Sequence, residues 1–196
     1  QHILSTGLKA TLRVIGLVND LLNVARIEEG RFGFRFTAQP FPAIVRSAAD
    51  ALKKLSEDKG ISLDLVIPDE NMPAVIVDQE KIGMALDNII TNAIKYTPPG
   101  GSVTVSVWHE GTSIYTAVKD TGIGIPAHQI SRIFDKFFRA ENAVRFQTSG
   151  TGLGLYVMKN IVESHGGRVW LESEENKGTT VTFSLPIKEK DRGDGQ

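Results

Sequence analysis

Two runs of alternating apolar and polar residues, only two residues apart, constrain the fold of this chain more than any other feature. Ser102–Glu110 reads SVTVSVWHE and Ser113–Asp120 reads SIYTAVKD, with Gly111 and Thr112 between them. Alternation with a period of two puts the valines of a strand on one face. A two-residue connection that contains glycine is typical of an antiparallel hairpin. The sequence therefore predicts a sheet with one apolar face, which a second layer must cover.

The segments around this hairpin alternate between helical and extended patterns. We expect helices over residues 41–59, 79–96 and 152–165, a short helix near 128–138, an extended connector over 34–42, and strands over 61–67, 74–78, 168–174 and 179–187. Hairpins with helices crossing between the strands are typical of the α/β class. The prediction is a two-layer α/β sandwich, with a mostly antiparallel, mixed sheet under helices.

The first 30 residues have the pattern of one long helix, over about 3–29. Its apolar seam advances alternately by four and three residues, through Leu4, Leu8, Thr11, Ile15, Val18, Leu22 and Ala25. Leu12, Leu17 and Leu21 widen this stripe, which suits a helical bundle better than a two-stranded coil. A helix packed on its own domain is the alternative. We favour a bundle with further partner helices, because a single helix cannot bury its own stripe.

Composition excludes several classes of function. The chain has 196 residues, of which 41% are hydrophobic and 23% charged, and its net charge is -1. So small a charge gives no field to attract nucleic acid or an anionic membrane. The sequence has no cysteine, which excludes disulfides and thiolate metal sites. No apolar run approaches the roughly 20 residues of a membrane span. We therefore expect neither nucleic-acid binding nor membrane contact by this chain.

The helix expected over 79–96 carries two asparagines, although asparagine is a poor helix former. Asn88, Asn92 and Lys95 form a narrow stripe opposite the broad apolar face of this helix. A solvated face is the simplest interpretation of any one of them. Together they present two amide oxygens, which suit Mg²⁺, and one cation, which suits a phosphate. The stripe therefore favours a site for a phosphate and its metal ion.

Two glycine-rich stretches could hold the rest of a nucleotide. DTGIG, residues 120–124, follows a strand, and its carboxylate could accept hydrogen bonds from an exocyclic amino group such as that of adenine. SGTGLGL, residues 149–155, opens a helix, where backbone N–H groups and the helix N-terminus suit an anion. A turn and a capped helix start are the structural alternatives. A third stretch, GTTVTF at residues 178–183, has by itself only the pattern of a turn into a strand.

Between the two glycine-rich stretches lies a loop with the character of a lid. Phe134, Phe137 and Phe138 could anchor it, although they could equally fill the edge of the core. Lys136, Arg139 and Arg145 are cations that a closing lid could bring to a triphosphate.

The joint pattern resembles the catalytic, ATP-binding domain of sensor histidine kinases of two-component systems. DNIITNAIKYT, DTGIGI, IFDKFFR, GTGLGL and GTTVTF occur in the order of that family's N box, first glycine box, F box, second glycine box and third glycine box. The resemblance covers about residues 34–186. Upstream, LVNDLLNVARIEEGRF resembles the end of the second helix of the family's dimerisation and phosphotransfer domain. It implies a bundle helix over 1–30, a catalytic domain over 31–187 and a disordered polar tail over 188–196.

The resemblance also implies a role for each matching residue. Asn92 is expected to bind Mg²⁺, and Asn88 to support the metal and the phosphates. Asp120 is expected to bind the adenine amino group, and Arg139 to reach the γ-phosphate from the lid. Asn88, Lys95 and Arg139 are the expected catalytic residues. The remaining contacts to ATP are expected from Lys95, Tyr96, Gly122, Gly124, Gly150, Thr151, Gly152, Leu153, Gly154 and Thr180.

The sequence departs from the family at the phosphoacceptor. The family's acceptor histidine is followed by an acidic residue and, a few places on, a proline. None of the four histidines, His2, His109, His128 and His165, stands in such a stretch. We therefore expect this chain to bind ATP but to transfer its γ-phosphoryl to a histidine that it does not contain.

Two other functions fit the same motifs. The ATP-binding superfamily that includes these kinases also includes hydrolases. Those hydrolases carry a glutamate one turn before the metal-binding asparagine, to polarise the attacking water. Asn88 stands at that place and cannot take a proton from water, which disfavours a simple ATPase. A non-catalytic ATP-binding module is the third possibility.

The kinase resemblance implies a response-regulator receiver domain as partner and a homodimer of the parent protein through the bundle. It also implies a cytoplasmic location, and leaves open an inner-membrane anchor on the parent protein.

Overall fold

The structure, a computed structural model, describes residues 2–67 and 72–187, with side chains in the first helix described at residue 11 and from residue 14 on. The elements in chain order are α1 His2–Glu28, β1 Thr37–Gln39, α2 Phe41–Asp58, β2 Ser62–Val66, β3 Val75–Val77, α3 Gln79–Tyr96, β4 Ser102–Glu110, β5 Ser113–Asp120, η1 Ala127–Arg132, α4 Glu141–Phe146, α5 Gly154–Ser164, β6 Arg168–Glu174 and β7 Gly178–Pro186. The tail expected over 188–196 lies outside the described residues.

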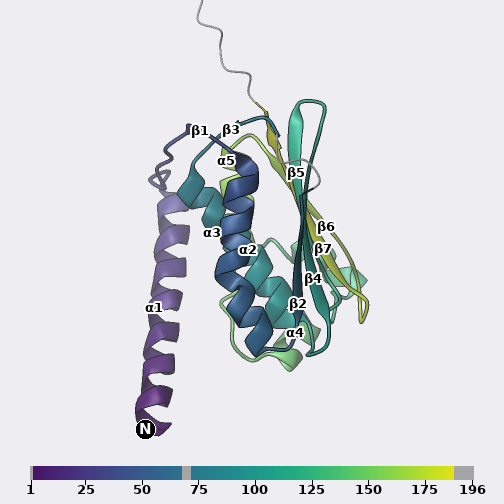
Figure 1. Cartoon of the computed structure of the whole chain (residues 1–196). Coiled ribbons are helices and arrows are strands. Elements are labelled where there is room, and N and C mark those ends of the chain that lie inside the picture. Colours follow the sequence, from purple (N-terminus) through teal and green to yellow (C-terminus); the bar gives the residue numbers. More distant parts are fainter. Residues whose placement is uncertain (1, 68–71, 188–196) are drawn as a thin grey trace, which may run out of the picture.

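The main sheet has five strands in the order β2-β4-β5-β7-β6. Strands β2 and β4 are parallel, and the other neighbours are antiparallel. Figure 1 shows α2, α3 and α5 together on one side of this sheet. Val105, Phe183 and Leu86 are among the buried residues of the single core that fills the space between the two layers. The predicted two-layer α/β sandwich with a mixed, mostly antiparallel sheet is confirmed.

Helix α3 holds the asparagine stripe, and its start is fixed by a side-chain cap. Asp78 precedes the helix, and its carboxylate accepts the backbone N–H of Lys81 at 3.0 Å and that of Arg35 at 2.7 Å. Such a cap satisfies donors that the first turn leaves unpaired. Ile82, Leu86, Ile89, Ile90, Ala93 and Ile94 are buried on the core side. Burial of this face fixes the rotation of the helix and so directs the asparagine stripe away from the core.

Some expected elements differ in extent or pairing. β3, expected over 74–78, does not join the main sheet but pairs with β1, which lies in the connector expected to be merely extended. Helix α5 begins at Gly154 rather than at residue 152, because Gly152 has φ +71°, which no right-handed helix contains. The short helix near 128–138 is a 3₁₀ helix over 127–132, and α4 follows it as a separate helix that the sequence pattern did not predict.

Helix α1 stands beside the helical layer, on the side away from the sheet (Figure 1). It touches the rest of the chain through its C-terminal half, where Val24 is buried and Glu28 pairs with Lys136. Val14, Ile15, Leu17, Val18, Leu21 and Leu22 remain 41–57% exposed. The helix therefore packs partly on its own domain and still presents an apolar stripe, and its place in a bundle stays a prediction. Among the described helices, none is both long and apolar enough to cross a membrane.

Candidate nucleotide-binding site

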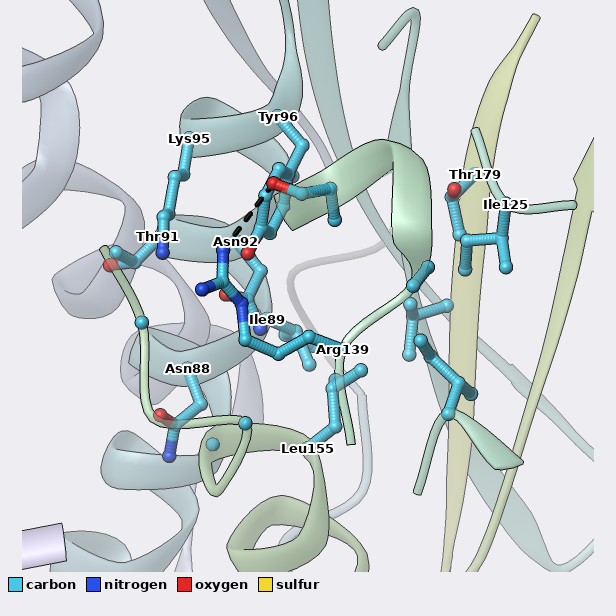
Figure 2. A pocket seen from close by; sticks show the side chains of 18 of the residues that line it. Asn88, Ile89, Thr91, Asn92, Lys95, Tyr96, Ile125, Arg139, Leu155 and Thr179 are labelled. Carbon is cyan, nitrogen blue, oxygen red and sulfur yellow. Dashed lines mark hydrogen bonds between the residues drawn. The ribbon is translucent and has the colours of Figure 1, made fainter. Parts of the chain in front are cut away.

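A cavity of about 390 Å³ lies between α3, the loop after β5, the lid loop and the start of α5. Figure 2 shows Asn88, Asn92 and Lys95 along one side of it, and Ile125 and Thr179 at the other. The segments that contain the five motifs are separated along the chain by up to about a hundred residues, yet all of them reach this one cavity. We call the part near α3 and the second glycine stretch the phosphate end, and the part near Asp120 the base end.

The phosphate end is lined by the polar stripe of α3. Asn88 and Asn92 both face the cavity, so their amide oxygens are available to a hard cation. The start of α5 lies directly against Asn88, because a Cβ added at Gly154 would stand 2.7 Å from the Asn88 Oδ1 atom. The unpaired N–H groups of that helix start therefore open beside the two amides, an arrangement that suits an anion with its metal ion.

The two cations of the phosphate end donate to backbone carbonyls of the lid loop and of the second glycine stretch. The Lys95 ammonium donates to the backbone carbonyl of Ser149. The Arg139 guanidinium donates to the carbonyls of Thr148 at 3.1 Å, Ala143 at 3.3 Å and Gln147. Carbonyl oxygens carry only a partial negative charge, so phosphate oxygens would be stronger partners for both cations. These backbone carbonyls thus occupy the positions of weaker, replaceable partners.

The base end is built around Asp120, the last residue of β5. Its side chain is only 8% exposed, and its Oδ1 atom accepts the backbone N–H groups of Gly122 at 2.8 Å and Thr179 at 3.2 Å. Burial raises the pKa of this carboxyl to about 6, although the two hydrogen bonds act in the opposite direction. Among the described residues, both donors reach Oδ1 and none reaches Oδ2. A second carboxylate oxygen is therefore left for a ligand that donates hydrogen bonds.

Glycine is required at two positions around the base end. A Cβ at Gly122 would lie 2.6 Å from the carbonyl oxygen of Tyr96, so the loop can pass α3 only without a side chain. Gly124 has φ +60°, and a Cβ there would overlap with the carbonyl of Glu174. The glycines of DTGIG thus serve first to pack the loop between α3 and β6, and this packing brings the backbone to the cavity wall.

Most of the residues expected to contact a nucleotide line this cavity. They are Asn88, Asn92, Lys95, Tyr96, Asp120, Gly124, Arg139, Gly150, Thr151, Gly152 and Gly154. Gly122 does not line it, and contributes its N–H to Asp120 instead. Leu153 is buried in the core with 2% exposure, where it helps to anchor the start of α5.

Thr180, which was expected near the base, is not among the residues that line the cavity. Thr180 pairs with Lys119 and Glu172, whereas Thr179 and Val181 line the cavity. Side chains of adjacent strand residues point to opposite faces of a sheet, so Thr180 points away from the cavity when its neighbours point into it. Thr179 therefore lies on the cavity wall where the sequence analysis expected Thr180.

Sequence reasoning missed several further lining residues. Ile125, Ala143, Leu155 and Leu171 supply apolar wall, and Leu17 and Asp20 of α1 reach the rim. The Thr151 hydroxyl donates to the Asp20 carboxylate at 3.0 Å, which ties the second glycine stretch to α1. Ile125 and Leu155 end the first and second glycine motifs and Leu17 lies in the apolar stripe of α1, but none of them was expected at the site. No local pattern marks Ala143, Leu171 or Asp20, because each reaches the cavity only through tertiary packing.

The histidines with described side chains lie away from the cavity. His109 and His128 are exposed, on a hairpin and on η1. His165 is buried, with its Nε2 accepting the backbone N–H of Asp78 at 3.0 Å and its Nδ1 lying 2.7 Å from the carbonyl of Ile161. A ring that accepts at one nitrogen and donates at the other is neutral, and both of its nitrogens already bond within the fold.

Comparison with known families agrees with this geometry. Residues 77–189 match the model of the family described as "Histidine kinase-, DNA gyrase B-, and HSP90-like ATPase". The chain belongs to this ATPase family. The match spans α3, the loops around the cavity and the sheet strands β4 to β7, and so includes most of the segments that build the site.

Relatives of this ATPase-family chain are sensor kinases. It is 41% identical over 188 residues to the sensor histidine kinase WalK of Bacillus subtilis, covering 94% of this chain and 30% of WalK. It is similar to full-length ShkA in complex with AMPPNP, with a TM-score of 0.81, 26% identity, and coverage of 97% of this chain and 39% of ShkA. The predicted resemblance to sensor histidine kinases is confirmed. The chain spans less than half the length of either relative.

The histidine kinase ThkA in complex with the response regulator protein TrrA has the same fold as this chain. The TM-score is 0.70 at 24% identity, with coverage of 94% of this chain and 53% of ThkA. Because the likeness extends over nearly the whole chain, it includes both the sheet with its helical layer and the region of α1.

Proposed function

We propose that this chain is the ATP-binding catalytic part of a sensor histidine kinase, which transfers the γ-phosphoryl group of Mg-ATP to a histidine for relay to a response-regulator aspartate. The observation that carries the proposal is the joining of two unlike ends in one cavity. A buried carboxylate with a free oxygen lies at one end, and two amides, two cations and a helix start lie at the other. A nucleotide has the matching polarity, with an amino-bearing base and an anionic tail.

The residues at the phosphate end fit a magnesium ion. Asn88 and Asn92 offer neutral oxygens, and Mg²⁺ commonly takes one or two protein ligands and completes its shell with phosphate oxygens and water. We assign Asn92 as the metal ligand and Asn88 as a support for the metal and phosphates. When bound, the ion would neutralise charge on the phosphates.

The chain's own residues would position the reacting group and balance its charge. The acceptor imidazole nitrogen attacks the γ-phosphorus in line with the departing β–γ bridging oxygen, and ADP leaves. Lys95 and Arg139, which now donate to backbone carbonyls, would turn to the phosphate oxygens as these displace the carbonyls. The N–H groups before α5 would hold the same oxygens, so the protein contributes mainly positioning and electrostatics.

The position of Asn88 favours transfer to a protein acceptor over hydrolysis. It lies against the start of α5 at the phosphate end, where a hydrolase would need a base for water. An amide cannot take that proton. The acceptor would then be a histidine outside the four of this sequence, because the three with described side chains lie on a hairpin, on η1 and in the core.

The remaining assignments rest on the relatives. We propose that residues 1–30 are the second helix of a dimerisation and phosphotransfer bundle, and that 31–187 form the catalytic domain. The exposed stripe of α1 would then pair with bundle helices in a homodimer of the parent protein. The partner that receives the phosphoryl group would be a response-regulator receiver domain, as the complex of ThkA with TrrA suggests for a protein of this fold. The cytoplasm is the expected location.

Calorimetric titration and a transfer assay test this function. The chain should bind ATP more tightly with Mg²⁺ than with excess chelator, and should phosphorylate a supplied bundle domain that carries the acceptor histidine. The same bundle domain with that histidine replaced by alanine is the matched control. Binding without transfer to any acceptor would indicate a non-catalytic module. Phosphate release that is independent of the acceptor and lost in Asn88→Ala would indicate a simple ATPase.

A further inference from the structure

Ser173 of β6 lies behind the wall of the base end, where no sequence motif marks it. Its hydroxyl oxygen accepts the backbone N–H of Ile125 at 2.9 Å. The same oxygen lies 3.0 Å from the carbonyl oxygen of Gly178 and 2.8 Å from the Thr179 hydroxyl. Ile125 and Thr179 both line the cavity. One hydroxyl thus joins the loop after β5 to the start of β7 at the base end.

The direction of each hydrogen bond follows from counting hydrogens. The Ser173 hydroxyl has one hydrogen, and a carbonyl can only accept, so that hydrogen must go to Gly178. The short contact with Thr179 then needs the Thr179 hydroxyl to donate to Ser173. The reverse assignment would leave two acceptor oxygens facing each other at 3.0 Å with no hydrogen between them. The Thr179 hydrogen therefore points at Ser173.

The result is a base end without a free donor on these groups. Ser173 takes the Ile125 N–H and the Thr179 hydroxyl, and the Oδ1 atom of Asp120 takes the N–H groups of Gly122 and Thr179. What remains for a ligand is the Oδ2 atom of Asp120, an acceptor. A base edge that offers a donor is accommodated there, and an edge that offers a carbonyl oxygen finds no donor among these groups.

We propose that Ser173 is a specificity-determining positioning residue, which turns the Thr179 hydroxyl away from the base and so favours a 6-amino purine over a 6-oxo purine. This proposal rests on the proposed ATP binding of the same cavity. Ser173 acts through Thr179 and Ile125 and does not touch the base. Its loss would free the Thr179 hydroxyl to donate toward the cavity, where it could meet a 6-oxo group.

Titration of ATP and inosine triphosphate against the intact chain tests this proposal, because the two nucleotides differ at the 6-position. In Ser173→Ala the ratio of the two affinities should fall about tenfold, the effect of roughly one hydrogen bond. Ser173→Thr keeps the hydroxyl and should keep the ratio. An unchanged ratio in Ser173→Ala, including one in which both affinities fall equally, would overturn the proposal, because a merely structural role changes both alike.

A double-mutant cycle with Thr179→Val separates the Thr179 route from loop support. In the Thr179→Val background, Ser173→Ala should change the ratio by a clearly smaller factor, and an equal fall in both backgrounds would contradict the role of Thr179. Thermal melting checks folding, and Ser173→Cys, with a weakly bonding thiol of similar size, replaces Ser173→Ala if the latter unfolds. A wild-type chain that binds neither nucleotide would refute the proposed function itself. If the wild-type chain and Ser173→Ala both prefer ATP to inosine triphosphate by the same factor, only this inference is refuted.

Discussion

The two ends of the cavity are built on different physical terms. At the base end, Asp120 is buried and its partners are backbone groups of packed segments, so its recognising oxygen is already in place. At the phosphate end, Lys95 and Arg139 hold backbone carbonyls of Ser149 and of the lid loop, so the proposed function requires these contacts to be exchanged before a phosphate is held. Under the proposed function, the comparison predicts that one end selects the base by fixed shape and hydrogen bonding, and that the other binds phosphates by charges that exchange their partners.

Glycine substitutions should show the largest difference between the ends. Gly124→Ala places a Cβ on the Glu174 carbonyl at φ +60°, and should cost at least about 3 kcal/mol in the free energy of unfolding. At the phosphate end, the Cβ of Gly150→Ala would stand 2.7 Å from the movable Lys95 ammonium, and should cost only about 1–2 kcal/mol. Denaturant unfolding measures both. Equal losses would mean that the two ends are equally rigid.

Removal of one recognising group from each end should separate base binding from phosphate binding. Asp120→Ala should weaken ATP, ADP and adenosine alike, by roughly 30-fold, because a hydrogen bond to a charged group contributes about 2 kcal/mol. Lys95→Ala should weaken ATP and ADP but leave adenosine within about twofold. Calorimetry with the three ligands gives the comparison. Loss of adenosine binding in Lys95→Ala would show that the ends are coupled.

The pH dependence of adenosine binding should report the base end alone. Burial raises the pKa of Asp120 from its ordinary value of 3.8 to about 6, so the carboxylate needed by the amino group is lost as pH falls through 6. Adenosine affinity should drop about tenfold between pH 7.5 and pH 5. Adenosine is preferred to ATP because a phosphate group also titrates near pH 6. Asp120→Asn should bind more weakly and show a flat profile.

The same raised pKa predicts the stability of the ligand-free chain. The folded state holds the Asp120 proton more tightly than the unfolded state. The contribution of this carboxyl to stability is therefore greatest below about pH 4 and is lost as pH rises to about 6. The loss is on the order of 1–3 kcal/mol. Asp120→Asn should remove it, which thermal melts of both proteins across this range would measure. A wild-type chain that gains stability over this range relative to Asp120→Asn would contradict the assigned direction.

Salt should produce the smallest of these effects, again at one end only. Raising the ionic strength from about 0.05 M to 0.5 M shortens the Debye length severalfold and weakens the attraction of Lys95 and Arg139 for phosphates. ATP affinity should fall by about threefold with Mg²⁺ held constant, whereas adenosine affinity should stay within error. A salt effect on adenosine would place charge recognition at the base end, contrary to the geometry.

Much of the fold was predictable because its signals are local. The hairpin of β4 and β5, the ends of α2 and the extent of α3 follow from alternation, glycine stops and an apolar face. The pairing of β3 with β1, away from the main sheet, did not follow, since both strands are three residues long and no local pattern names a partner. Helix α4 was missed because it buries no residue, and so carries no periodic apolar face.

The candidate site was predictable where chemistry demanded an unusual residue in an ordinary element. Asparagine lowers the stability of a helix, and glycine lowers the stability of elements that do not need it. Asn88, Asn92 and the clustered glycines can therefore be recognised in the sequence. Ser173 and Asp20 do not stand out, because a serine in a strand and an aspartate on a helix surface are common. Asp20 reaches the rim of the cavity only because α1 lies against α5, and Ser173 lies behind its wall only because β6 pairs with β7.

By itself the sequence determined the layer architecture, the family resemblance and the set of residues that could hold a nucleotide. Tertiary structure alone decided that Thr179 rather than Thr180 faces the cavity, that backbone carbonyls hold Lys95 and Arg139, and that the Thr179 hydroxyl lies 2.8 Å from that of Ser173. The physical reason is that the periodicity of side chains and the backbone conformation depend on residues that are close along the chain. Strand register, burial and the direction of a hydroxyl hydrogen depend instead on partners that are distant along the chain.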